Sequence, residues 1–119
     1  MAKEAGADAV KIQTYTADSL TIDCDNADFQ LDGTLWEGKT YYQLYESIAA
    51  PLEWTEELFA YAKQLGITLF SSPFSTKDVD FLEQHGCPFY KIASFEAMDY
   101  PFFKRVAQTG KPIIISTGV

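Results

Sequence analysis

The chain has 119 residues, of which 47% are apolar and 15% aromatic, and its formal net charge is −8. This length suits one ordinary domain with a real core, and the apolar content indicates a folded protein rather than a disordered one. The negative charge disfavours nucleic acid as a partner because the phosphates would be repelled, and no apolar run approaches the roughly 20 residues of a membrane span.

The first elements in chain order are a helix end and a short strand. Residues 1–5 have the pattern of a final helical turn. Residues 9–14 then form an apolar strand in which Lys11 and Gln13 share one face. A long acidic connection with several aromatic residues follows, from 15 to 38. A connection of this length is either functional or a solvated excursion, and both interpretations stay open.

The rest of the chain alternates helices with short apolar strands. Ser75 is expected to cap one helix, with Asp78 in the capping-box position. His85, the sole histidine, falls at the end of that helix, where it is expected to cap the helix or to interact with its dipole. In the helix that follows Pro51, an apolar stripe is expected to face the core: Trp54, Leu58, Phe59, Ala62 and Leu65. The predicted helices occupy residues 39–49, 51–65, 75–85 and 99–109, and the predicted strands residues 67–72, 89–94 and 112–116.

The alternation of strands and helices indicates the fold class. Unbroken strand–helix order implies a parallel sheet, and a doubly wound sheet and a (β/α)8 barrel are both compatible with it. No G-x-G-x-x-G follows any strand, so the nucleotide-binding doubly wound sheet lacks its usual mark. Polar residues at successive strand ends favour the mouth of a barrel: Lys11, Gln13, Ser72, Lys91, Ser94 and Ser116. We therefore predict an α/β fold, a partial (β/α)8 TIM barrel of about four consecutive βα units with a parallel sheet.

The strand around Lys91 is the most informative stretch of the chain. An unpaired ammonium inside an apolar strand is costly, unless the side chain reaches a polar site. Lys91 and Ala93 share one face, and alternate residues near the carboxyl end of a barrel strand reach the active-site mouth. The alternative is a Lys91 side chain that extends into solvent from the strand end.

Four segments taken in this order resemble the sialic acid synthase family. They are residues 6–14 (GADAVKIQT), 70–74 (FSSPF), 90–96 (YKIASFE) and 110–118 (GKPIIISTG). The family condenses phosphoenolpyruvate with an acylamino sugar aldehyde to form nonulosonic acids. Within the family, the KIASFE wording, the LWEG element at 35–38 and the loop opening at Tyr15 favour the branch that makes pseudaminic acid. Sialic acid synthases proper usually have glycine at the position of Phe95.

The resemblance implies roles for the polar residues at the strand ends. The lysines would hold the carboxylate and phosphate of phosphoenolpyruvate, and the serines would donate hydrogen bonds to the same anion: Lys11, Lys91, Ser72, Ser94 and Ser116. Gln13 and Glu96 would face the sugar and the developing tetrahedral centre, with Glu96 positioning or deprotonating the attacking water. In the family mechanism, C3 of phosphoenolpyruvate attacks a metal-activated aldehyde carbon, water adds at C2, and phosphate leaves with C–O cleavage.

The resemblance also implies parts that this sequence lacks. The family holds a divalent metal, Mn or Mg, through two histidines, whereas His85 lies on no matching motif, so no metal ligand is assigned in this chain. We expect residues 1–119 to be the central part of a single (β/α)8 synthase domain, without its first strand, its last strands and a C-terminal domain, and to be inactive alone. The full-length enzyme is expected to be a homodimer that binds neither nucleic acid nor membranes. Cys24 and Cys87, without C-x-x-C spacing, are typical of free thiols in a reducing cytoplasm.

Two other functions remain open at this stage. The first is a class I aldolase or related lyase, in which Lys91 forms a Schiff base inside the barrel. The second is a non-catalytic half-barrel that serves as a binding or assembly module, because exposed sheet edges pair with other chains.

Overall fold

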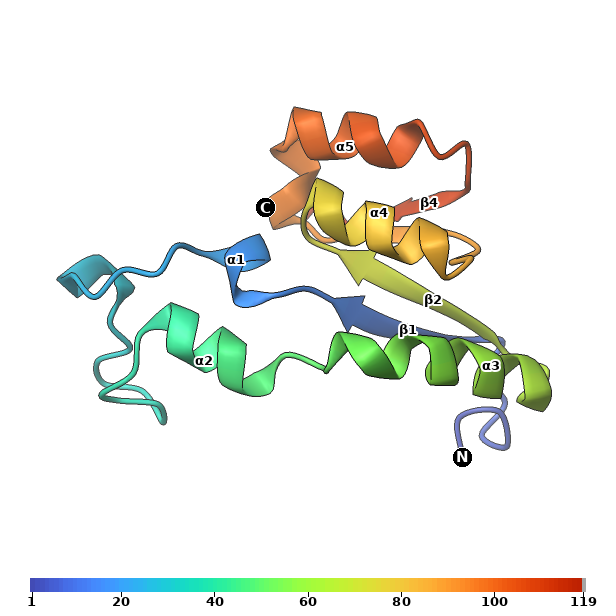
Figure 1. Cartoon of the computed structure of the whole chain (residues 1–119), viewed down its shortest axis with the longest axis horizontal. Coiled ribbons are helices and arrows are strands. Elements are labelled where there is room, and N and C mark those ends of the chain that lie inside the picture. The colour runs from blue at the N-terminus through green and yellow to red at the C-terminus, as the bar shows by residue number, and fades with distance from the viewer. Residues whose placement is uncertain (119) are drawn as a thin grey trace.

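The computed structural model describes residues 1–118 (Figure 1). Its strands are β1 (Ala9–Thr14), β2 (Thr68–Pro73), β3 (Tyr90–Ile92) and β4 (Ile113–Ile115). Its α-helices are α1 (Ala17–Leu20), α2 (Tyr41–Ile48), α3 (Thr55–Leu65), α4 (Thr76–Gln84) and α5 (Tyr100–Ala107). Three short 3-10 helices complete the described elements: η1 (Ala27–Phe29), η2 (Leu52–Trp54) and η3 (Phe95–Met98).

The four strands form one parallel sheet in the order β1-β2-β3-β4. This confirms the predicted parallel sheet with strands adjacent in chain order. Its register pairs Gln13 with Ser72, Ser71 with Tyr90, and Lys91 with Ile114. Because paired residues of adjacent strands point to the same side, the register determines which side chains share a face of the sheet.

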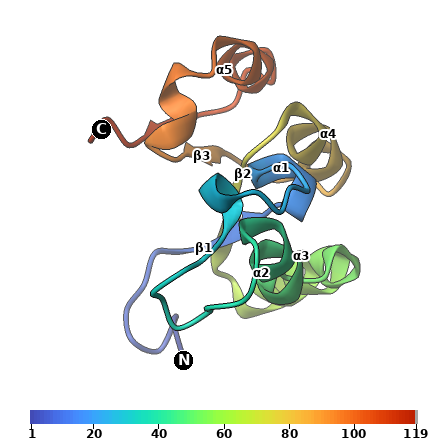
Figure 2. The same ribbon diagram turned by 90° about the vertical axis from the view of Figure 1, so that its left-hand side faces the viewer.

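Helices α3, α4 and α5 lie on one side of the sheet, as the view along the strands shows (Figure 2). The core fills the space between α4, α5 and the middle strands. Its most deeply buried members are Val79, Leu82, Tyr90, Ile92, Phe102 and Val106. Removal of these side chains from water drives the helices onto this face. One covered face and one open face are what a (β/α)8 barrel shows when only part of its circumference is present.

Local sequence signals account for the ends of several helices. The Ser75 hydroxyl accepts a hydrogen bond from the Asp78 N–H (3.2 Å), so Ser75 caps α4 as predicted. The Asp99 carboxylate caps α5 in the same way, by accepting from the Phe102 N–H (3.0 Å). Gly66 ends α3 in the left-handed region, at φ 63°, which glycine adopts at little steric cost.

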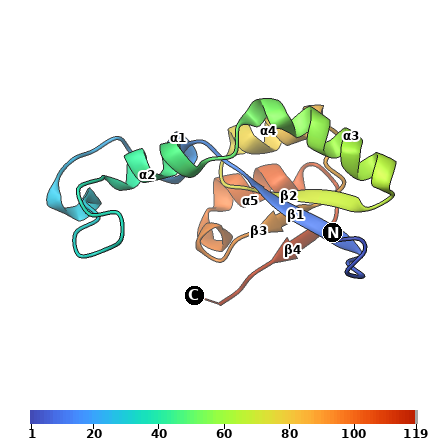
Figure 3. The ribbon, with the colours of Figure 1, turned by 90° about the horizontal axis from the view of Figure 1, so that it is seen from below.

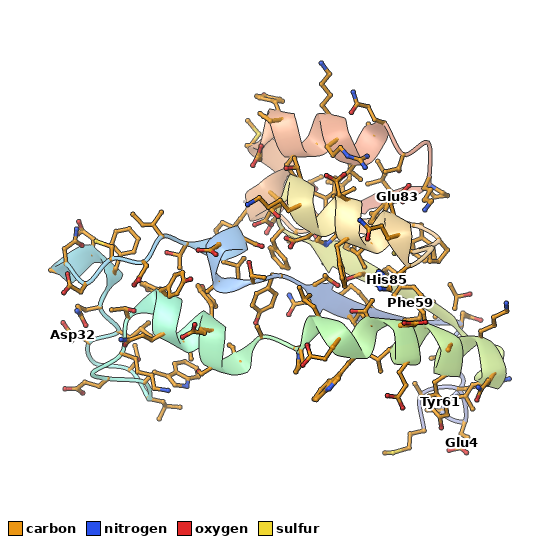
Figure 4. All side chains as sticks on the ribbon, viewed as in Figure 1. Glu4, Asp32, Phe59, Tyr61, Glu83 and His85 are labelled. Atoms are coloured by element: carbon orange, nitrogen blue, oxygen red, sulfur yellow. The ribbon has the colours of Figure 1, made fainter. Side chains whose placement is uncertain are left out.

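The connection between β1 and α3 extends beyond the carboxyl ends of β1 and β2. It contains α1, η1 and α2, and the view from below shows it projecting away from the sheet (Figure 3). Asp32 lies at its far end (Figure 4). Residues 22–30 within it are mostly exposed. The excursion therefore lies on the side of the sheet where barrel enzymes carry their active sites.

The expectation that the apolar stripe of α3 faces the core was only partly right. Ala62 is buried (8% exposed), whereas Trp54 is 55% and Leu65 41% exposed. The helix turns only one narrow side to β2, and its other flank borders an open apolar hollow of about 660 Å³ between β1, α3 and residues 1–4. Glu4 and Tyr61 both line this hollow (Figure 4).

Several predicted boundaries also differ from the structure. Residues 1–5 form a hydrogen-bonded turn, with the Ala5 N–H 2.9 Å from the Met1 carbonyl oxygen, and no helix. An isolated turn fixes several dihedral angles for one hydrogen bond and does not propagate. β3 and β4 have three residues each, fewer than the predicted ranges 89–94 and 112–116. Ser94, two residues after β3, is the N-cap of η3, so the backbone leaves the ladder earlier than the apolar pattern indicated.

Candidate active site

Lys11 and Lys91 lie on the same face of the sheet, the one that α3, α4 and α5 leave open. Lys11 shares a face with Gln13 by alternation, and Gln13 pairs with Ser72. Because Ser71 pairs with Tyr90, the next position places Ser72 beside Lys91. Partial burial, and then the positive charge of Lys91, hold the pKa of Lys11 below its usual value. The two ammonium groups are thus close enough to repel each other, and a bound anion would relieve that repulsion.

Ser72 lies between Gln13 and Lys91 in a row that crosses three strands. Adjacent strands are about 4.8 Å apart, so the row spans about 10 Å. Ser72 is nearly completely buried, at 2% exposed. A small anion over Ser72 would therefore be within reach of side chains from both neighbouring strands.

The ammonium of Lys91 is held near the carboxyl end of β3. Lys91 Nζ donates to the Ile92 carbonyl oxygen at 2.7 Å. The same carbonyl accepts the Ser116 backbone N–H at 3.1 Å, which brings the first residue after β4 beside β3. Ser94 lies two residues after β3, as the N-cap of η3, and both serines are partly buried. The structure therefore gathers four of the five predicted anion-binding residues around the ends of β2, β3 and β4, with Lys11 deeper along β1.

Gln13 and Glu96 line one hollow of about 550 Å³ next to this face. Glu96 Oε2 is buried, and within residues 1–118 it has no hydrogen-bond partner. Desolvation, supported by the negative charge of Asp99, raises the pKa of Glu96 above its usual value. A carboxyl group with a raised pKa beside a cavity is suited to exchange a proton with a bound molecule.

The other walls of this hollow are apolar or aromatic, and the sequence did not reveal them. Tyr15 packs edge-on against Phe74, with ring centroids 5.6 Å apart, and against Tyr45, at 6.3 Å. The remaining wall residues are Leu20, Ile48 and Phe95. Tyr15 and Phe74 directly follow β1 and β2, so their place after a strand was a usable signal. Tyr45 comes from α2 in the excursion, and no local pattern relates it to the strands.

The described part of the chain offers no evident metal site. Within residues 1–118, no three or more His, Cys, Asp or Glu side chains are grouped so that they could hold a metal ion. His85 Nδ1 lies 2.9 Å from the Phe81 carbonyl oxygen at the end of α4, which confirms its predicted capping role. In Figure 4, His85 and Phe59 flank a shallow hollow between α4 and α3, on the covered side of the sheet. No helix within these residues combines the length and apolar character needed to cross a membrane.

A sequence profile of the NeuB family matches residues 1–119. The chain belongs to the NeuB family. It is 52% identical to a pseudaminic acid synthase of Campylobacter jejuni and 47% identical to one of Helicobacter pylori, over 99% and 98% of the chain. It is also 36% identical to an N,N'-diacetyllegionaminic acid synthase of Legionella pneumophila. The chain spans about a third of the length of these relatives: 34%, 34% and 33%.

Two solved structures share the fold. The sialic acid synthetase of Leptospira borgpetersenii superposes with a TM-score of 0.79 at 22% identity, over 99% of this chain and 36% of that one. The spore coat polysaccharide biosynthesis protein SpsE of Bacillus subtilis gives a TM-score of 0.70 at 32% identity, over 98% and 29%. The predicted relationship to the sialic acid synthases and the predicted α/β class are confirmed.

Proposed function

We propose that the enzyme containing this segment condenses phosphoenolpyruvate with an acylamino sugar aldehyde, an acylamino hexose, to form a nonulosonic acid, and that this product is pseudaminic acid. The observation that carries the proposal is the placement of Lys11 and Lys91 on one open face of the sheet, beside the buried Ser72. Phosphoenolpyruvate carries a carboxylate and a phosphate, and such an anion is bound best by fixed cations that form charge-assisted hydrogen bonds. The 47–52% identity to pseudaminic acid synthases supports the choice of product.

The proposed anion site extends to the residues that follow β3 and β4. Ser94 and Ser116 would donate hydrogen bonds to the phosphate or carboxylate, as Ser72 would from the end of β2. Lys91, already held at the end of β3, would bring its ammonium to the same anion with little rearrangement. Preorganised donors of this kind lose little entropy when the substrate binds.

The sugar would occupy the hollow that Gln13 and Glu96 line. In the proposed reaction, C3 of phosphoenolpyruvate forms a bond to the aldehyde carbon and the aldehyde oxygen takes up a proton. Water then adds at C2 while Glu96 positions it or accepts its proton, and the tetrahedral centre collapses with cleavage of the C–O bond to phosphate. Glu96 suits this role because it lines the hollow and its Oε2 atom has no hydrogen-bond partner among residues 1–118.

Further parts of the proposal concern the full-length enzyme. A divalent metal, Mn or Mg, belongs to it by resemblance, but residues 1–118 do not supply a fitting set of ligands, and no step is derived through the metal. We also propose that residues 1–119 are the central part of one (β/α)8 domain, that the enzyme is a homodimer, and that it acts in the cytoplasm. Its similarity to synthases of soluble sugar acids supports the last of these.

The test is a product assay on the full-length enzyme. Phosphoenolpyruvate and an acylamino hexose are supplied with Mn or Mg, and the product is identified by mass spectrometry together with released phosphate. One nonulosonic acid for each phosphate supports the proposal. A borohydride-stable adduct on Lys91 with a keto substrate, and no nonulosonic acid, would replace it by the aldolase.

A further inference from the structure

Asp78 is a buried carboxylate on the outer side of the candidate site. It lies in the first turn of α4 and is only 5% exposed. One carboxylate oxygen accepts a hydrogen bond from the Ser19 hydroxyl (3.1 Å), and the other accepts one from the Phe74 backbone N–H (3.2 Å). A carboxylate can only accept, and a buried one is tolerated when donors and a helix N-terminus stabilise its charge. Each oxygen of the Asp78 carboxylate therefore has one hydrogen-bond donor, and neither donor belongs to Ser75, the N-cap of α4.

The two partners of Asp78 belong to different walls of the hollow. Ser19 lies in α1, which follows β1, and its neighbour Leu20 lines the hollow. Phe74 follows β2 and lines the hollow with its own ring. Tyr15 packs edge-on against that ring. Asp78 thus joins, from behind, the start of the long excursion to the exit of β2.

We propose that Asp78 is a positioning residue for the sugar substrate: it holds the excursion against the exit of β2, so that the walls of the hollow keep the spacing that the sugar requires. This inference rests on the proposed function. The excursion needs such a tie because its middle part, residues 22–30, is mostly exposed. The two lysines proposed to hold phosphoenolpyruvate need no such tie, because Lys11 and Lys91 are carried on strands of the sheet.

Loss of the Asp78 contacts should change the KM values of the two substrates differently, whereas loss of a purely structural contact would affect both alike. In the full-length enzyme, Asp78→Ala should raise the KM for the sugar about tenfold, since two buried hydrogen bonds are lost, and should change the KM for phosphoenolpyruvate less than about twofold. Ser19→Ala removes one of these bonds, together with the bond that the Ser19 hydroxyl accepts from the Thr16 N–H (3.1 Å), and should raise the sugar KM about threefold. Ser19→Thr keeps the hydroxyl and should have the wild-type KM for the sugar.

Asp80 provides the matched control. Asp80 lies on α4, the same helix as Asp78, but its carboxylate forms an ion pair with Arg105 at 2.6 Å and is largely exposed. Asp80→Asn should leave both KM values unchanged. If Asp78→Ala does not fold, Ser19→Ala and Ser19→Thr carry the test alone, because Ser19 is only partly buried.

The deciding experiment combines steady-state kinetics with amide hydrogen exchange on the same variants. A selective rise in the sugar KM, together with faster exchange at residues 15–20 and at the Phe74 amide, supports the proposal. Equal rises in both KM values, or a lower kcat with both KM values unchanged, would overturn it. Hydrogen exchange can be measured without turnover, so the two proposals can fail separately. If the wild-type enzyme makes no nonulosonic acid, the proposed function fails. If exchange in Asp78→Ala is the same as in wild type, the tie made by Asp78 is refuted.

Discussion

Replacing Lys91 by methionine is the sharpest perturbation of the proposed anion site. Methionine keeps most of the apolar length of the side chain and removes only the ammonium. A charge-assisted hydrogen bond contributes about 1.5–3 kcal/mol, so its loss corresponds to a weakening of phosphoenolpyruvate binding by about 10-fold to 150-fold. Part of this loss is offset at Lys11. The charge of Lys91 is one of the causes that lower the pKa of Lys11, and Lys91→Met removes that cause. The cost to folding is small, since Lys91 Nζ makes one bond to the Ile92 carbonyl oxygen.

Calorimetric titration of phosphoenolpyruvate into the full-length enzyme measures this effect directly. Lys77→Met is the matched control, because Lys77 is an exposed lysine of α4 on the covered side of the sheet, and its binding constant should not change. The double variant Lys11→Met/Lys91→Met should lose detectable binding. A dissociation constant for Lys91→Met within about twofold of wild type would refute the assignment and favour a lysine that points into solvent.

Three further predictions follow from particular contacts. Glu96→Gln should leave phosphoenolpyruvate binding nearly intact, lower kcat at least about tenfold and remove the acidic limb of the pH–rate profile. Because the pKa of Glu96 is raised, that limb should lie above the pH at which an ordinary glutamate titrates in the wild-type enzyme. An unchanged pH–rate profile in Glu96→Gln would contradict the proposed role. Lys111→Met should lower the free energy of unfolding by about 1–2 kcal/mol at neutral pH, as measured by urea denaturation. Lys111 Nζ lies 2.5 Å from a Glu83 oxygen in a partly buried ion pair, and the Tyr90 hydroxyl donates a hydrogen bond to the same carboxylate. Residues 1–119 alone should self-associate at micromolar concentration in sedimentation, because β1 and β4 are open edges and the sheet leaves one face uncovered; a monodisperse monomer would argue against this.

The Lys111→Met prediction carries a definite dependence on pH. Burial by itself would raise the pKa of Glu83, but hydrogen bonds from Lys111 and Tyr90 outweigh it and hold the pKa below its usual value. A carboxyl group with a lowered pKa in the folded state stabilises the fold above the pKa that it has in the unfolded chain. The difference in stability between wild type and Lys111→Met should therefore persist at neutral pH and shrink as the pH falls below about 4.

The sequence predicted the strand order from the alternation of strands and helices, and it predicted the shared face of the lysines from the barrel hypothesis. Residues 9–14 were placed without error, and Lys11 and Lys91 share a face as the barrel hypothesis required. Strand ends were less accurate: β3 stops at Ile92, because Ser94 turns the chain into η3 two residues later. The backbone there exchanges ladder hydrogen bonds for a turn, a choice that an apolar pattern does not encode.

Long-range partners could not be predicted from local patterns. Asp78 was expected to take part in a capping box with Ser75. The Asp78 N–H does donate to the Ser75 hydroxyl, but the Asp78 carboxylate accepts from the Ser19 hydroxyl and the Phe74 N–H instead of from Ser75. Ser19 is distant in the sequence, so only the packing of the excursion determines this pairing. The same reason hides Tyr45 from sequence reasoning, since it reaches the hollow from α2.

The proposed function depends most on Lys11 and Lys91 binding one anion from the open face of the sheet. A crystal structure of the full-length enzyme with phosphoenolpyruvate tests it most directly. We predict one molecule over Ser72, with both lysine Nζ atoms within about 4 Å of its phosphate or carboxylate oxygens. Phosphoenolpyruvate bound elsewhere, or in contact with neither lysine, would contradict this assignment of the two lysines.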